Sequence, residues 1–295
     1  HLVGPEHAFA DRGVIIGPLG RGGGPERPGI GLPPGKDVGD HERPEPQGPR
    51  PALDWPSYAA GRTRGVPWFL LSARLVAQAG VPVLLHGWNS HQNPIASVRG
   101  ALDVAGIPAA EDMADAARLG DGSIAYLPLE AFSPRAFELL RLRDVLGLRS
   151  AINTVLRVLN PAGAPASVQG VFHPPYRDLQ ADAGALLGQA RLTVIKGGGG
   201  EFERHPSKDV TLFGLRDGAV WQGAAGPIWD GTRRLADDAH VPQDLARLWD
   251  GTLDDPFAEA VVLGTAALAL ETAGLPEPDT LARELWRSRS PAQAA

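Results

Sequence analysis

The sequence predicts an α/β protein whose mainly parallel sheet is flanked by helices. From residue 53 onward, short apolar segments alternate with segments in which apolar residues recur every three or four positions. This alternation is typical of parallel strands joined by crossover helices. We assign strands to residues 81–87, 122–127, 167–173, 191–196 and 210–218. We assign helices to residues 67–80, 96–106, 109–120, 139–147, 152–159, 176–190, 242–251, 255–274 and 278–288.

Composition places the chain among ordinary globular proteins. Its 295 residues are 43% hydrophobic and 21% charged, which is enough for a substantial core. The absence of cysteine excludes disulfides, thiolate metal ligands and a cysteine nucleophile. No run approaches the ~20 apolar residues of a membrane span, so we expect a cytoplasmic protein without a membrane partner. A net charge of −6 argues against general coating of nucleic acid but leaves a local basic groove open.

Residues 1–52 differ from the rest, since the first 51 residues contain 12 glycines and 10 prolines. Such a segment buries too little apolar surface to offset its ordering entropy. We therefore expect 1–52 to be an irregular or disordered leader and 53–295 to be the α/β domain, with a helical C-terminal part. A sharper hypothesis is that the leader is an out-of-frame translation of a GC-rich gene and not the native N-terminus.

The first elements after the leader follow from local signals. We interpret residues 53–65 as a loop. The next helix has Pro67 in its first turn and Gly80 as its stop. A short buried strand then ends at His86 and Gly87.

The central stretch, residues 140–160, combines helical spacing with a basic cluster. Apolar residues at helical spacing predict an amphipathic helix that ends at Gly147: Leu139, Leu140, Leu142, Val145 and Leu146. A second helical run ends before Pro161, because the residue before proline disfavours helix. Five arginines lie in and around this stretch: Arg135, Arg141, Arg143, Arg149 and Arg157. They indicate an anion site, although a solvated helix face is an equally good interpretation.

In such a fold, ligands bind at the carboxyl ends of the strands. Three loops qualify: residues 86–89, 128–133 and 196–203. In the last, the amides of Gly197 to Gly200 could form an anion nest beside Lys196. A flexible turn is the alternative for the glycines, and a strand-end histidine bonded to backbone is the alternative for His86.

The order of motifs resembles that of the anthranilate phosphoribosyltransferase family (glycosyltransferase family 3). The motifs are LLHGWN, RLRDVLGLRSAINTVLRVLNP, GVFHP and VIKGGGGEFE. The resemblance implies a phosphoribosyltransferase-type α/β domain that binds phosphoribosyl pyrophosphate with magnesium. It also implies an N-terminal helical domain that forms a homodimer, which the leader here replaces or lacks.

The resemblance carries over to individual residues. Under it, Arg143 contacts an aromatic acid acceptor and Glu203 helps to hold magnesium. The predicted substrate-binding residues are Arg62, His86, Gly87, Asn89, Arg143, Asn153, Lys196, Gly197 and Gly198. No catalytic side chain is assigned. The predicted function is transfer of phosphoribose from phosphoribosyl pyrophosphate to an aromatic amine.

Several positions depart from the family pattern. Leu85 stands where the family has lysine, Phe202 replaces the aspartate of the magnesium pair, and the first glycine loop, near residues 59–66, is degraded. These differences favour an alternative: a catalytically inactive protein on the same fold that binds single-stranded nucleic acid, as in a divergent branch to which this chain looks closest. Its phosphate-tracking groove would be lined by Arg62, Arg64, Arg143, Arg149 and Lys196. A third interpretation is an inactive fragment that exposes an apolar face.

Overall fold

The computed structural model describes residues 51–59, 65–88, 94–147, 151–236 and 239–289. The predicted leader lies outside these ranges except for its last two residues. Arg62, Arg64, Asn89 and Arg149 also lie outside the described residues.

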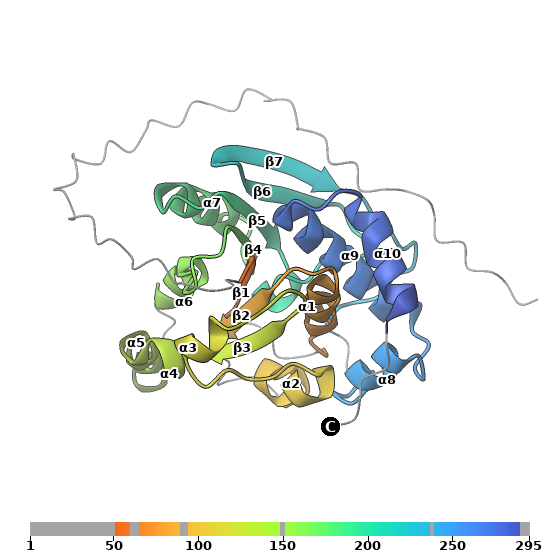
Figure 1. Cartoon of the computed structure of the whole chain (residues 1–295), viewed down its shortest axis with the longest axis horizontal. Helices are drawn as coiled ribbons and strands as arrows, with labels where there is room; N and C mark the ends of the chain where they lie inside the picture. Colours follow the sequence, from red (N-terminus) through yellow and green to blue (C-terminus); the bar gives the residue numbers. More distant parts are fainter. Residues whose placement is uncertain (1–50, 60–64, 89–93, 148–150, 237–238, 290–295) are drawn as a thin grey trace, which may run out of the picture.

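The described chain contains a seven-stranded sheet in the order β3-β2-β1-β4-β5-β6-β7 (Figure 1). Strands β1 to β5 are parallel to one another, and β6 and β7 add an antiparallel hairpin beside β5 at one edge. The mainly parallel α/β sheet predicted from the sequence is confirmed. The strands are β1 (Leu53–Ser57), β2 (Val83–Gly87), β3 (Ile124–Pro128), β4 (Ala166–Val171), β5 (Arg191–Lys196), β6 (Val210–Arg216) and β7 (Ala219–Ala225).

Helices cover both faces of the sheet. One face packs against α1, α2, α8, α9 and α10, and the other against α3 and α7, while α4, α5 and α6 gather near the carboxyl ends of the first three strands (Figure 1). The helices are α1 (Phe69–Gln78), α2 (Val98–Ala105), α3 (Met113–Ala116), α4 (Leu129–Phe132), α5 (Pro134–Leu146), α6 (Ile152–Val155), α7 (Tyr176–Leu186), α8 (Asp244–Asp250), α9 (Pro256–Ala273) and α10 (Pro278–Ser288). Short 3₁₀ turns are η1 (Pro94–Ala96), η2 (Leu156–Val158) and η3 (Gly198–Gly200).

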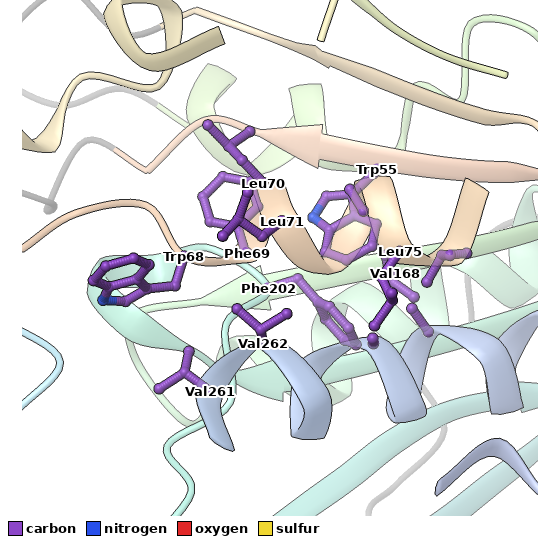
Figure 2. Packing of buried hydrophobic residues seen from close by; sticks show 14 of the residues in the cluster. Trp55, Trp68, Phe69, Leu70, Leu71, Leu75, Val168, Phe202, Val261 and Val262 are labelled. Atoms are coloured by element: carbon purple, nitrogen blue, oxygen red, sulfur yellow. The ribbon is translucent and has the colours of Figure 1, made fainter. Parts of the chain in front are cut away.

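The largest core cluster lies between the sheet and α1 and α9 (Figure 2). Trp55 stacks on Phe69 at 6.2 Å between ring centroids and meets the edge of Phe202 at 5.4 Å. Helix α9 is apolar on all sides, as expected for a helix surrounded by protein. It is the one helix in the described ranges long and apolar enough to cross a membrane, and 78% of its 18 residues are buried against the rest of the fold.

The interpretation of residues 53–65 as a loop was wrong at its start, because Leu53–Ser57 forms the central strand β1. Pro56 argued against a central strand, since proline cannot donate to a ladder. The structure tolerates it because β1 pairs with β4 only at Leu53 and Asp54, so that this ladder ends before Pro56.

Strand β7 was missed by the sequence analysis. Its first residues are exposed, so it lacks the apolar run that identified the other strands. The turn before it is Asp217-Gly218, with φ of 52° and 77°. Two consecutive positive φ values suit a tight hairpin turn, and Asp-Gly is its usual sequence signal.

Three helix predictions also need correction. Helix α1 begins at Phe69 and not at Pro67, and residues 109–120 contain only the single-turn α3. The predicted apolar stripe on α5 does not face the core. Only Leu140 is buried, whereas the other four are exposed: Leu139, Leu142, Val145 and Leu146. The predicted stop at Gly147 is confirmed by its left-handed conformation.

Candidate functional site

The sheet has one topological switch point, between β1 and β4. The chain moves from β1 outward to β2 and β3, and from β4 outward to β5 in the opposite direction. Ligands of open α/β sheets bind in the crevice at the carboxyl ends of such a strand pair. Because the ladder between β1 and β4 ends at Asp54 and Ser167, the two strands are free to separate beyond that point.

Glu201 fills this crevice. Its Oε1 accepts hydrogen bonds from Oγ of Ser57 at 2.9 Å and from the backbone amide of Ala59 at 3.1 Å. The glutamate is fully buried. On the β4 side, a Cβ on Gly170 would lie 2.0 Å from the carbonyl carbon of Glu201, so the absent side chain lets the loop pass close to the strand. Two hydrogen-bond donors from the end of β1 therefore converge on one anionic oxygen.

Arg157 lies beside the same crevice. Its Nη2 donates to the carbonyl of Tyr58 at 3.2 Å and its Nη1 to the carbonyl of Asn153 at 2.6 Å. Burial lowers the pKa of Arg157, and the charge of Glu201 counteracts this effect. Asn153, predicted to bind substrate, is half-buried, and its Oδ1 has no hydrogen-bond partner among the described residues. The structure thus places Asn153, Arg157 and the end of β1 side by side.

His86 is completely buried at the end of β2. Its Nδ1 lies 2.8 Å from the hydroxyl of Tyr58, and its Nε2 lies 3.1 Å from Oδ1 of Asp54. Oγ of Ser167 donates to the other oxygen of Asp54 at 2.8 Å. Burial raises the pKa of Tyr58 well above its usual value, so the phenol stays protonated. His86 therefore supports the end of β1 through Tyr58 and has no exposed surface for a ligand.

Gly87, the residue after His86, allows close packing of two strands. A Cβ at this position would lie 2.1 Å from the carbonyl oxygen of Ser57. The glycine thus allows β1 and β2 to approach where both strands end.

The glycine run after β5 folds back on the protein. The Gly197 amide donates to the carbonyl of Val171 at 3.2 Å, and the Gly198 amide donates to the carbonyl of Glu203 at 3.0 Å. These two amides are engaged within the protein and do not form the open nest that we expected. Lys196, the last residue of β5, is exposed.

Glu203 is also completely buried, and its Oε2 accepts from the Phe69 amide at the start of α1 at 3.1 Å. Its neighbour Phe202 is buried in the core against Trp55. In the described parts of the chain, no group of three or more His, Asp or Glu side chains could hold a metal ion. Because Phe202 is apolar and buried, and Glu203 is buried and accepts from the start of α1, the two residues at the magnesium position that the resemblance implies do not fit that ion.

Arg143 is half-buried in the last turn of α5. Within the described ranges, neither Arg143 nor the exposed Arg135 forms an ion pair. The helix is held to the strand ends by an apolar cluster in which Tyr58, Leu140 and Leu156 are buried.

Three residues at this site, Ser57, Ala59 and Glu201, were not predicted from the sequence. The first two lie in the segment interpreted as a loop, and Glu201 lies between the glycine run and the predicted metal ligand. Its position directly after a strand-end glycine run was the available signal, since that is where ligand-facing groups gather.

Comparison with known proteins agrees with this architecture. No family model matches the chain. The anthranilate phosphoribosyltransferase of Thermus thermophilus is 32% identical over 235 residues, which are 74% of this chain and 68% of that protein. That of Aromatoleum aromaticum is 30% identical over 229 residues, and the chain spans 64% of it, less than two thirds of its length.

The solved structures show the same relationship. The crystal structure of anthranilate phosphoribosyltransferase from Thermus thermophilus matches with a TM-score of 0.63 and 26% identity. The match covers 81% of this chain and 74% of that one. The chain belongs to the anthranilate phosphoribosyltransferase family.

Proposed function

We propose that this protein transfers phosphoribose from phosphoribosyl pyrophosphate to an aromatic amine. The observation that carries the proposal is the arrangement at the switch point. There, Ser57 and Ala59 donate to Oε1 of Glu201, and Arg157 lies beside them. Family membership supports the reaction class. The homodimer and the cytoplasmic location expected from the sequence remain part of this proposal.

In this reaction the acceptor nitrogen attacks the anomeric carbon of the ribose, the bond to the pyrophosphate oxygen breaks, and pyrophosphate leaves with that electron pair. The nitrogen, positively charged after the attack, then releases one proton to the solvent. The hydroxyl of Ser57, the amide of Ala59 and the guanidinium of Arg157 would stabilise the departing oxygens. Such catalysis depends on positioning and on fixed charge and requires no protein nucleophile. Because the residues present do not fit magnesium, no step is assigned to a metal.

The test is pyrophosphate release from phosphoribosyl pyrophosphate with anthranilate and magnesium in the assay. If Arg143 orients the acceptor carboxylate, R143A lowers release by about tenfold or more, since a hydrogen bond to a charged group contributes roughly 1.5–3 kcal/mol. R135A on the same helix is the matched control and leaves release unchanged. Acceptor-independent release, or none from folded protein, contradicts the proposal.

A second function, binding of single-stranded nucleic acid, is favoured by one observation. Arg135 and Arg143 lie on one helix without ion pairs to the described residues. If these arginines contacted phosphates, the affinity for nucleic acid would fall steeply as the salt concentration rises. Titration with single-stranded DNA at several salt concentrations tests it: R135A and R143A should each weaken binding and reduce the salt dependence. Equal binding by both variants and the wild type argues against this function.

A further inference from the structure

We infer that Glu201 is an internal occupant of the anion site, which a pyrophosphate-bearing ligand must displace in order to bind. The inference takes the class of ligand from the proposed function. The geometry itself depends only on described side chains and backbone at the switch point.

Two hydrogen-bond donors at the end of β1 converge on one carboxylate oxygen. A serine hydroxyl and a backbone amide two residues apart both donate to the same Oε1 atom of Glu201. Donors that converge at the end of a strand form a suitable receptor for an anionic oxygen. A phosphate oxygen and the carboxylate oxygen of Glu201 cannot both accept from this pair.

Close backbone contacts hold the loop that carries the carboxylate of Glu201. A Cβ on Gly197 would lie 1.7 Å from the carbonyl oxygen of Glu201, and Gly170 makes a similarly close approach from β4. The loop turns through Gly199 and Gly200, which have φ of 64° and 98°. Glycine adopts these angles without strain. The backbone of Glu201 is therefore held by close contacts, and its side chain enters the crevice from a defined position.

The charge of Glu201 acts on the neighbouring Arg157. Arg157 is close enough to Glu201 for the two charges to interact, and it donates to the carbonyl that lies between Ser57 and Ala59. With the glutamate in place, its negative charge partly neutralises Arg157 and repels a second anion. Removal of that charge would leave Arg157 beside two donors, a combination that suits a phosphate group.

Glu203 provides an internal comparison. It is equally buried, but its carboxylate accepts from the first amide of α1 and so acts as a helix cap. We expect removal of Glu203 to disturb folding and removal of Glu201 to open the ligand site. The two neighbouring acids thus have separable roles.

The experiment measures binding of inorganic pyrophosphate by isothermal titration calorimetry, without turnover. E201A should bind pyrophosphate at least about tenfold more tightly than the wild type, because it loses the competing charge and exposes two donors. The affinity of E201Q for pyrophosphate should lie between those of the wild type and E201A, because glutamine keeps the shape of the side chain but not its charge. Adding S57A to E201A should remove much of the gain. D182N removes one exposed acid from α7 and should bind as the wild type does.

The outcomes separate this inference from the proposed function. Tighter pyrophosphate binding by both Glu201 variants, with no phosphoribosyl transfer in any of them, supports the inference and removes the transferase. Acceptor-dependent transfer supports the transferase. If E201Q leaves the KM for phosphoribosyl pyrophosphate unchanged, the inference is overturned. Equal pyrophosphate binding by wild type and both variants, or none by any of them, also overturns it. Circular dichroism shows which variants are folded, and E201Q decides the matter where E201A does not fold.

Discussion

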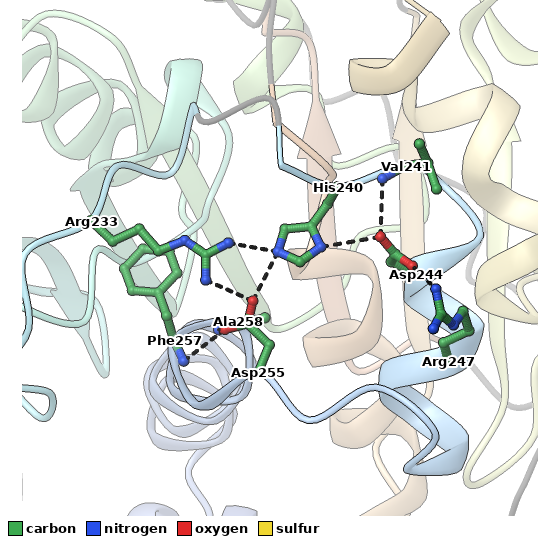
Figure 3. Close-up of polar contacts among 8 residues, drawn as sticks. All are labelled: Arg233, His240, Val241, Asp244, Arg247, Asp255, Phe257 and Ala258. Carbon is green, nitrogen blue, oxygen red and sulfur yellow. Dashed lines mark hydrogen bonds and ion pairs between the residues drawn. The ribbon is translucent and has the colours of Figure 1, made fainter.

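The carboxylate of Asp255 lies 2.8 Å from Nε2 of His240 and joins two parts of the chain (Figure 3). Its Oδ2 also accepts from Nη1 of Arg233 at 2.7 Å, while its Oδ1 accepts from the amides of Phe257 and Ala258 at 3.0 Å each. One side chain therefore caps the core helix α9 and holds the segment that crosses its N-terminus.

Replacement of Asp255 by alanine should lower the free energy of unfolding by about 2 kcal/mol, the upper range for loss of an N-cap. D255N is the matched control. It keeps a capping oxygen and should be less destabilising, because asparagine is as good a cap as aspartate and only the contacts of Oδ2 with Arg233 and His240 are lost. Urea unfolding measures both variants. Equal destabilisation by the two would show that the ion pair, and not the cap, is what matters.

His240 lies between Asp255 and Asp244, and these two carboxylates predict that the fold loses stability in acid (Figure 3). Burial raises the pKa of Asp255 and of Asp244, but the amide hydrogen bonds from Ala258 and Val241 and nearby positive charges outweigh it, so both pKa values lie below the usual range. A depressed pKa stabilises the fold above the unfolded value of about 3.9, and this contribution is lost as pH falls through the folded value.

Urea unfolding at pH 7 and at steps between pH 5 and pH 3 checks this prediction. The wild type should lose stability steeply below about pH 4, where unfolded carboxyl groups take up protons. D255N should show a shallower loss, so that the two curves converge in acid. Parallel curves would mean that Asp255 does not contribute to the acid sensitivity.

Much of the fold could be predicted from the sequence because its strands are short, apolar and separated by clear helices. Strand β1 could not, because its proline and its short apolar run resemble a loop. Only the ladder with β2, which extends from Leu53 to Ser57, shows why that segment is extended. Local propensity carries no information on which neighbour completes a strand.

The candidate site was predicted less well than the fold. The sequence predicted a site at the strand ends, and Glu201 and Arg157 both contact the end of β1 there. The role of each group was not recognised, because sequence cannot distinguish a glycine amide that faces a ligand from one that bonds to Val171 across the loop. That distinction depends on tertiary distances of a few ångströms.

The exposed apolar residues of α5 give a direct test of how the helix packs. L142Q and V145Q should change the free energy of unfolding by no more than about 0.5 kcal/mol, since both side chains are 46% or more exposed. L140A should cost about 2–5 kcal/mol, because Leu140 is buried under the strand ends. Urea unfolding compares the three. A large loss in V145Q would mean that this face is covered in solution.

Restoring an acid at Phe202 should not restore a metal site. The side chain is fully buried and meets Trp55 edge-on at 5.4 Å, so F202D places a carboxyl group in an apolar core. F202L, which keeps an apolar side chain, should remain folded with a loss of about 1–2 kcal/mol from imperfect packing. Thermal unfolding with and without magnesium measures both variants. We expect F202D to be strongly destabilised and its midpoint to be unaffected by magnesium, because Glu203 beside it is already engaged with the start of α1. A midpoint that rises with magnesium in F202D, but not in F202L, would show that the position can still form a metal site.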